Sequence, residues 1–331
     1  MVITFMIGNG FDLACGLKSS YKDVYEGYVK TQSKSELIAK FKKDLDENWE
    51  NWADFEMGMA EYAQNFDNEA ELIECVTDFR EYMEDHLKRE EEKFHKTFGN
   101  VYPVYGENIN DYVESEILHY YKGCGKGLDV LGERAMLEAA TWNFINFNYT
   151  DILETILNEC FYGFHVENIH GTLAEDDVVM GADNLEQVKT KFPKGTDVEL
   201  FFIKPYINEE NDPRRVETCK RYIQSSDCII VFGLSMGDSD LSWKNEIKEW
   251  LLSNEEHHLF IYDFEYASKQ IRGFSMRKKT ERDIIQGKCL LLGLESEGSY
   301  IKQIHIPVGY KMLAIQEKID EWIANDLNSV A

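Results

Sequence analysis

Four short motifs combine glycines with side chains that can bond a ligand or move a proton. They are IGNGFD (7–12), NFNYTD (146–151), ENIHGTL (167–173) and VFGLSMGDSD (231–240). Each motif ends or follows an apolar run of the kind that forms a buried strand. Because the carboxyl ends of parallel strands face one crevice, we expect the four motifs to meet at a single site.

The first motif is a glycine turn at the end of the apolar run at 2–7. Gly8 and Gly10 can take positive φ angles and let the backbone approach a ligand, and the following helix offers N–H groups to an anion. Leu13, however, stands where a dinucleotide fingerprint has its third glycine, and Asp12 brings a negative charge. Asp12 therefore either bonds a ribose or caps the helix, or the ligand is not a dinucleotide; a purely structural turn is the alternative.

The second and third motifs offer a carboxamide and an imidazole. Asn148 and Tyr149 fall in the turn before a helix that starts near Asp151, so the amide of Asn148 either orients a hydroxyl or a water, or only shapes the turn. His170 precedes Gly171 at the end of another apolar run, and the ordinary pKa of histidine suits proton transfer near neutrality. We predict Asn148 and His170 as the catalytic pair.

The fourth motif connects the apolar run at 228–234 to an amphipathic helix. Ser235 and the amides of the turn could hold a phosphate, while a carboxylate such as Asp238 could accept hydrogen bonds from ribose hydroxyls. The same residues could only turn the chain and cap the helix. Asp238 and Asp240 without a histidine partner give weak grounds for a metal site, and we expect no metal.

The elements that must position these motifs change in character along the chain. From about residue 20 to residue 140 apolar residues recur at three- or four-residue spacing, which predicts an all-helical block. Later apolar runs predict strands at 142–147, 164–169, 178–181, 199–203, 228–234, 258–264, 289–294 and 305–308, with helices at about 151–161, 210–225, 239–253 and 311–325. This alternation predicts one α/β domain over 1–331: a Rossmann-like, doubly wound, mostly parallel sheet whose helical insertion, 20–140, covers the cleft.

Composition excludes several classes of function. The 331 residues include 61 acidic and 35 basic ones, a formal net charge of -26, which argues against nucleic acid as a general partner. The sequence has no signal-peptide pattern and no apolar stretch near the roughly 20 residues that cross a bilayer, so we expect a cytoplasmic protein that does not bind membranes. Its seven cysteines are dispersed, with no CxxC pair, which argues against disulfides and a zinc ribbon.

In this order, the segments IGNGFDLACGLKSSY, NFNYTDILE, NIHGTL and FGLSMGDSD resemble the AbiH family of bacterial phage abortive-infection proteins. That resemblance extends over most of the chain, includes NWADFE (51–56), and implies a role in phage defence. The four motifs alone are also similar, more distantly, to the sirtuin-like NAD-hydrolysing domains of other anti-phage systems. This second likeness implies a sirtuin-like fold, NAD as the substrate and cleavage of the bond between nicotinamide and ribose.

The sirtuin-like resemblance also implies roles for particular residues. Asn148 would position a ribose hydroxyl or the attacking water, and His170 would act as the general base. The candidate binding residues are Gly8, Asn9, Gly10, Phe11, Asp12, Tyr149, Gly233, Ser235 and Asp238, with Ser235 and Asp238 at the distal half of the dinucleotide. The chain lacks the four-cysteine zinc module of sirtuin deacetylases, so the resemblance does not imply deacetylation.

Three functions remain open from the sequence. The first is an NAD glycohydrolase in phage defence, and the second is a hydrolase of another nucleotide in the same role. The third is a nucleotide-binding sensor without turnover, whose helical block serves partners or self-association as a homo-oligomer. In that block Trp49 and Trp52 have the spacing of core residues, while Glu56 reaches the cleft if the block covers it.

Overall fold

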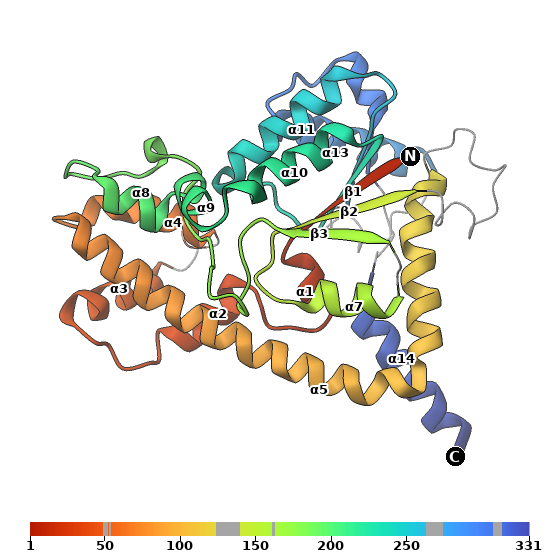
Figure 1. The fold of residues 1–331 in the computed structure, drawn as a ribbon, viewed down its shortest axis with the longest axis horizontal. Coiled ribbons are helices and arrows are strands. Elements are labelled where there is room, and N and C mark those ends of the chain that lie inside the picture. The colour runs from red at the N-terminus through yellow and green to blue at the C-terminus, as the bar shows by residue number, and fades with distance from the viewer. Residues whose placement is uncertain are drawn as a thin grey trace.

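A six-stranded parallel sheet forms the centre of the molecule (Figure 1). The computed structural model describes residues 1–48, 52, 54–123, 140–160, 163–262, 274–306 and 313–330. The strand order is β3-β2-β1-β4-β5-β6, and every pairing of these strands is parallel. The strands are β1 (Val2–Ile7), β2 (Thr141–Asn146), β3 (Phe164–Asn168), β4 (Cys228–Phe232), β5 (His258–Tyr262) and β6 (Ile304–His305). The order reverses between β1 and β4, which is where doubly wound sheets bind their ligands.

Helices cover both faces of this sheet. Ile3 and Phe5 of β1 point into one core, which contains apolar residues of α7 and α14. Met6 points into the core on the other face, which contains residues of α10, α11 and α13. The bounds are α7 (Ile152–Cys160), α10 (Pro213–Ser225), α11 (Leu241–Ser253), α13 (Phe274–Leu291) and α14 (Ile315–Val330). A parallel strand buried on both faces is nearly all apolar, which explains the run VITFMI; its one polar side chain, Thr4, forms a buried hydrogen bond with Ser226.

Between β1 and β2 the chain leaves the sheet and forms the predicted helical block. Its helices are α1 (Gly10–Ala14), α2 (Tyr21–Tyr28), α3 (Glu36–Glu47), α4 (Phe55–Tyr62) and α5 (Glu69–Gly123). Helices α2 to α5 pack around a separate core, in which the rings of Phe55 and Phe79 stack with their centroids 3.7 Å apart. Trp52 is buried in this core, as its spacing predicted, whereas Trp49 lies outside the described residues.

Helix α5 bends sharply part-way along its length (Figure 1). Pro103 lies inside this helix, and a proline there removes a backbone hydrogen bond and kinks the axis. One part of α5 packs on the helical block, and the other passes beside α14, where Tyr105 and Tyr112 contact Trp322. The bend lets one helix follow both the helical block and the sheet core.

Three predicted strands are wrong. Residues 178–181 are irregular, apart from a single parallel bridge from Ala182 to Ile203, and residues 199–203 lie mostly in a helix. Residues 289–294 begin inside α13. A short apolar run has no period that separates a strand from a buried helix, so burial alone produced these patterns. The ends of two other runs, 263–264 and 307–308, lie outside the described residues.

The remaining elements connect the larger ones. They are α8 (Thr196–Phe202), α9 (Lys204–Asn211) and the 3-10 helices η2 (Ala63–Asn65), η4 (Leu185–Gln187), η5 (Asp238–Asp240) and η6 (Ser299–Gln303). Within the described part of the chain, no helix has both the length and the hydrophobicity that a membrane crossing requires. The parallel sheet and the helical block after β1 are thus as predicted, while the Rossmann-like and sirtuin-like identity of the fold, and its treatment as one domain, stay predictions.

Candidate functional site

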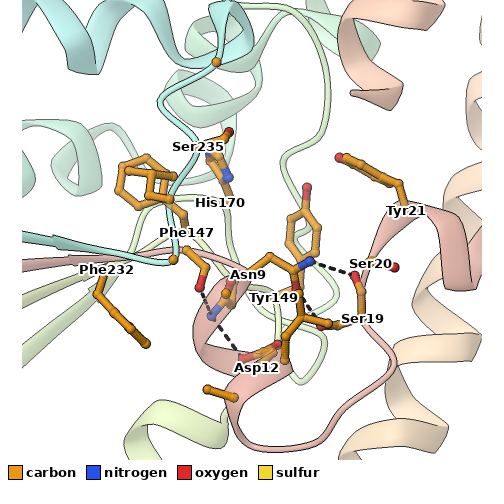
Figure 2. A pocket seen from close by; sticks show the side chains of 18 of the residues that line it. Asn9, Asp12, Ser19, Ser20, Tyr21, Phe147, Tyr149, His170, Phe232 and Ser235 are labelled. Atoms are coloured by element: carbon orange, nitrogen blue, oxygen red, sulfur yellow. Dashed lines mark hydrogen bonds between the residues drawn. The ribbon is translucent and has the colours of Figure 1, made fainter. Parts of the chain in front are cut away.

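A cavity of about 1000 Å³ lies at the carboxyl ends of the strands, between the sheet and the helical block. Residues after β1, β2, β3 and β4 line it, so all four sequence motifs reach the same space. The helical block supplies the facing wall through residues of α2, α4 and α5, among them Glu56, Leu87 and Tyr21, the last of which is labelled in Figure 2. Its volume is at the upper end of the range of about 300–1000 Å³ that small-molecule sites occupy.

The structure brings most of the predicted site residues to this cavity. Those that line it are Gly8, Asn9, Gly10, Asp12, Asn148, Tyr149, His170, Gly233 and Ser235. Phe11 instead packs edge-on against Phe232 in the core, because neighbouring positions of a helix point in different directions. The side chain of Asp238 is 71% exposed and pairs with Lys244 at 2.6 Å, so it lies outside the lining.

The glycines of the first motif serve a contact between two loops. The N–H groups of Gly8 and Gly10 donate to the carbonyls of Phe232 and Gly233, each at 2.9 Å. A β-carbon on Gly10 would lie 2.5 Å from the α-carbon of Gly233. Of these glycines only Gly233 has a positive φ, of 68°. The expectation that Gly8 and Gly10 adopt positive φ angles is therefore wrong, and their amides bond to protein instead of an anion.

Asp12 is buried and holds the turn that carries Asn148. Its Oδ1 accepts a hydrogen bond from Asn148 Nδ2 at 3.0 Å, and its Oδ2 accepts one from Thr150 Oγ1 at 2.8 Å. Burial raises the pKa of Asp12 to about 7, because desolvation disfavours its charged form. Asp12 thus caps no helix, and both of its oxygens are used to fix the position of a neighbouring turn.

A second set of contacts fixes the same turn from the side of α5. Glu91 Oε1 accepts a hydrogen bond from the backbone N–H of Asp151 at 2.8 Å, and His95 Nε2 lies 2.7 Å from Asp151 Oδ1. Among the described residues, these three side chains are the group with ligand atoms close enough to share a metal ion, within 4.8 Å. Here His95 and Asp151 bond to each other, and the contact joins the helical block to the turn between β2 and α7.

His170 forms a buried part of the cavity wall. Its side chain is only 6% exposed, and its ring meets that of Phe147 edge-on, with the centroids 5.2 Å apart (Figure 2). Burial, together with the nearby charge of Lys204, lowers the pKa of His170 to about 3, so the imidazole is neutral at physiological pH. Its Nε2 has no hydrogen-bond partner within the described chain and lies 3.5 Å from Asp240 Oδ1.

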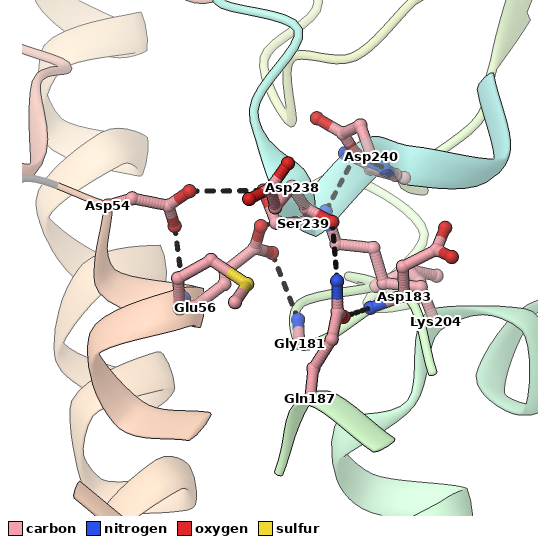
Figure 3. Close-up of polar contacts among 12 residues, drawn as sticks. Asp54, Glu56, Gly181, Asp183, Gln187, Lys204, Asp238, Ser239 and Asp240 are labelled. Atoms are coloured by element: carbon pink, nitrogen blue, oxygen red, sulfur yellow. Dashed lines mark hydrogen bonds and ion pairs between the residues drawn. The ribbon is translucent and has the colours of Figure 1, made fainter. Parts of the chain in front are cut away.

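A buried ionic cluster, formed by Glu56, Lys204 and Asp240 (Figure 3), lies beside His170. Lys204 Nζ is 2.7 Å from Glu56 Oε2 and 2.9 Å from Asp240 Oδ1. The other oxygen of Glu56 accepts the N–H of Gly181 at 2.9 Å. Although burial opposes ionisation of the ammonium group, the two carboxylates raise the pKa of Lys204 above its usual value. The cluster therefore links α4 of the helical block to α9 and η5.

Sequence reasoning foresaw only part of this cluster. Glu56 lines the cavity, as expected if the helical block covers the cleft. Lys204 was missed, and Asp240 was considered only for a metal or a turn. Nothing near Lys204 in the sequence signals its burial, because lysine is usually exposed and its two partners lie in distant segments of the chain.

Comparison with models of protein families shows which family this chain belongs to. A profile described as "Bacteriophage abortive infection AbiH" matches residues 4–262, from β1 to the end of β5. The chain belongs to the AbiH family. The residues matched in this AbiH protein include all four motifs, the helical block and the ionic cluster around Lys204. No curated protein matches the chain.

Membership of the AbiH family confirms the first of the two resemblances and associates the chain with phage abortive infection. The similarity to sirtuin-like domains stays a prediction. Chemically, the cavity of this AbiH protein combines an amide held by Asp12, a neutral imidazole whose Nε2 has no partner among the described residues, and a buried acid–base cluster. Such groups can orient hydroxyls and water and accept a proton, without a strong nucleophile.

Proposed function

We propose that this AbiH protein acts in phage abortive infection by hydrolysing NAD to nicotinamide and ADP-ribose, through a sirtuin-like site. One observation carries the proposal: Asn148 and His170 line a single cavity at the point where the strand order of a parallel sheet reverses. That is the general location of nucleotide sites in doubly wound sheets. The family supports the defence role, and the two side chains support the reaction.

The proposed reaction needs little covalent help from the protein. The bond between C1′ of the ribose and the nicotinamide nitrogen breaks, and its electron pair leaves with the now neutral nicotinamide. A water oxygen bonds to C1′ and its proton passes to a base, so the transition state resembles an oxocarbenium ion. In our proposal Asn148 positions the ribose or the water, and His170 accepts the proton while the carboxylate of Asp240, 3.5 Å away, stabilises the imidazolium.

A second candidate is the binding or hydrolysis of a different nucleotide, including a sensor without turnover. The amides of Gly8 and Gly10 are engaged within the protein, and Lys204 is paired with two carboxylates. These groups therefore offer little to a pyrophosphate, which favours a ligand with fewer phosphates.

The test is nicotinamide release from NAD by the purified protein, followed by chromatography. We expect Asn148→Ala and His170→Ala each to reduce the rate at least 100-fold, because each removes a group from the reacting ribose. His165→Ala, at an exposed histidine of β3, is the matched control and should keep the wild-type rate. Turnover that neither cavity substitution changes would exclude the proposed roles, and nucleotide binding without turnover would identify a sensor.

A further inference from the structure

We propose that the end of the cavity beside the helical block is a subsite for a ribose that carries a positively charged base, and not for a phosphate. The residues of this acidic subsite are Asp54, Glu56, His170, Lys204 and Asp240, all in the cavity lining. The inference rests on the proposed function, because it assigns one half of the proposed substrate to one end of the cavity.

The charges of the acidic subsite favour a cation. The acidic subsite contains three carboxylates, those of Asp54, Glu56 and Asp240, and one ammonium group, that of Lys204 (Figure 3). Lys204 lies between Glu56 and Asp240, at 2.7 and 2.9 Å, so its charge is already matched by two partners. Protonation of Glu56 would still leave two carboxylates against one ammonium. Because charges interact strongly where water is excluded, this end attracts a cationic ring and repels a phosphate.

Asp54 adds its charge from the N-terminus of α4. One of its oxygens accepts the backbone N–H of Met57 at 3.1 Å, and the other accepts the hydroxyl of Ser239 at 3.3 Å. Both partners are neutral donors, so Asp54 has no cation of its own in these contacts. It therefore adds a second unpaired negative charge to the cavity lining beside the ionic cluster.

Nε2 of His170, which faces Asp240, lacks a hydrogen-bond donor that a ligand could supply. A hydrogen bond between the His170 ring and the backbone of Phe147 raises the pKa of the ring. The ring is therefore the donor in this hydrogen bond. In the neutral ring Nε2 is then an acceptor, and it faces the acceptor Oδ1 of Asp240 at 3.5 Å. A buried acceptor without a donor is costly, and Nε2 has no partner within the described residues. A ribose hydroxyl that donates to Nε2 would supply the missing partner, while Asp240 Oδ1 already accepts a hydrogen bond from Lys204 Nζ at 2.9 Å.

The contacts of Lys204 make a resident metal ion a weaker occupant. Its ammonium group already lies between the carboxylates of Glu56 and Asp240, where a bound cation would otherwise sit. What remains is the neutral acceptor Nε2 of His170 and the carboxylate charge that Lys204 does not match. The first suits a hydroxyl group and the second suits a delocalised cation. A nicotinamide riboside unit has both features, because its ring nitrogen is positively charged and its ribose has a vicinal diol.

Calorimetry on the full-length protein tests this assignment with two ribosides and one anion. Nicotinamide riboside is cationic, dihydronicotinamide riboside has the same ribose with an uncharged ring, and inorganic pyrophosphate has neither feature. We expect the cationic riboside to bind at least tenfold more tightly than the uncharged one, with no competition from pyrophosphate. Equal affinities, no binding of either riboside, or displacement by pyrophosphate would overturn the proposal.

Two variants link the preference to the acidic subsite. Asp240→Asn removes a charge but keeps an acceptor, and it should reduce the tenfold preference to less than threefold. Glu56→Gln should also reduce the preference for the cationic riboside, and it serves as the test variant if Asp240→Asn does not fold. Glu61→Gln, an exposed residue of the same helix as Glu56, is the control and should retain the full preference. An unchanged preference in both cavity variants would contradict the assignment.

The outcome is separable from that of the proposed hydrolysis, because NAD turnover is measured in its own assay. A preference for the cationic riboside without NAD turnover would keep the subsite and reject the hydrolase. Turnover without the preference would keep the hydrolase and reject the subsite.

Discussion

Asn148 and Asp12 are 136 positions apart in the chain, yet the amide of Asn148 donates a 3.0 Å hydrogen bond to the buried carboxylate of Asp12. Thr150 donates to the same carboxylate, so one side chain after β1 fixes the whole turn after β2. The position of the candidate catalytic amide therefore depends on a group whose ionisation is costly. We therefore expect the stability of the fold to depend on pH through Asp12.

Asp12→Asn is expected to reduce the pH dependence of stability. The folded pKa of about 7 lies above the ordinary 3.8, so between these values the folded protein keeps a proton that the unfolded chain loses. Stability from this group therefore falls as pH rises from about 4 to about 7, by up to roughly 4 kcal/mol. Urea unfolding at pH 5 to 8 should show a flatter profile for Asp12→Asn than for wild type or the exposed control Asp46→Asn. Parallel profiles would contradict this account.

His170 is expected to be neutral across pH 5 to 8 in the folded protein. Its folded pKa of about 3 lies below the ordinary 6.5, so between these values the unfolded chain binds a proton that the folded protein does not. The stability that the neutral ring contributes is therefore lost as pH falls from about 6.5 toward 3. Nitrogen-15 NMR of the histidine rings, assigned with His170→Gln, should show an uncharged imidazole at pH 5. A midpoint near 6.5 for this ring would mean that it is solvated, and would disprove the burial described here.

Gly233→Ala is expected to destabilise the fold by more than about 2 kcal/mol. The residue has a φ of 68°, and a β-carbon there would lie 2.7 Å from the α-carbon of Gly10, so strain and a clash act together. Gly287→Ala in α13 is the control, because nothing lies within 4 Å of its added carbon. That helical substitution should gain about 0.5–1 kcal/mol. Chemical unfolding midpoints of the two variants should move in opposite directions.

Lys204→Met is expected to cost about 3–5 kcal/mol, because it leaves the carboxylates of Glu56 and Asp240 buried without their cation. Adding Glu56→Gln should recover part of this loss by removing one of the two charges. The exposed Lys191→Met serves as the control and should stay within about 0.5 kcal/mol of wild type. If the double variant is no more stable than Lys204→Met in unfolding experiments, an unpaired charge on Glu56 is not what destabilises Lys204→Met.

The sequence was most informative where one local property determines structure. The run VITFMI predicted β1 because both of its faces are buried, and the three- and four-residue spacing predicted the helical block. The runs at 199–203 and 289–294 failed because an apolar stretch in a helix has the same composition as one in a strand. Secondary structure that depends on distant packing leaves no period to detect.

The candidate site shows the same division. Asn148 and His170 could be predicted together because strand ends of a parallel sheet meet at one edge. Phe11 and Asp238 have neighbours that line the cavity, but sequence adjacency does not determine the direction of a side chain. Lys204 reaches the site only through its contacts with residues of two distant segments, so nothing in its own neighbourhood indicates its partners.

The close approach of Gly10 and Gly233 also limits how the gene can change. The two codons lie far apart, yet neither can specify a side chain while the other loop keeps its place. Random mutagenesis of a single loop would mostly discard variants at these positions for failing to fold, before their binding could be selected. Libraries that diversify both loops in the same clone are the ones able to explore new ligands for this cavity.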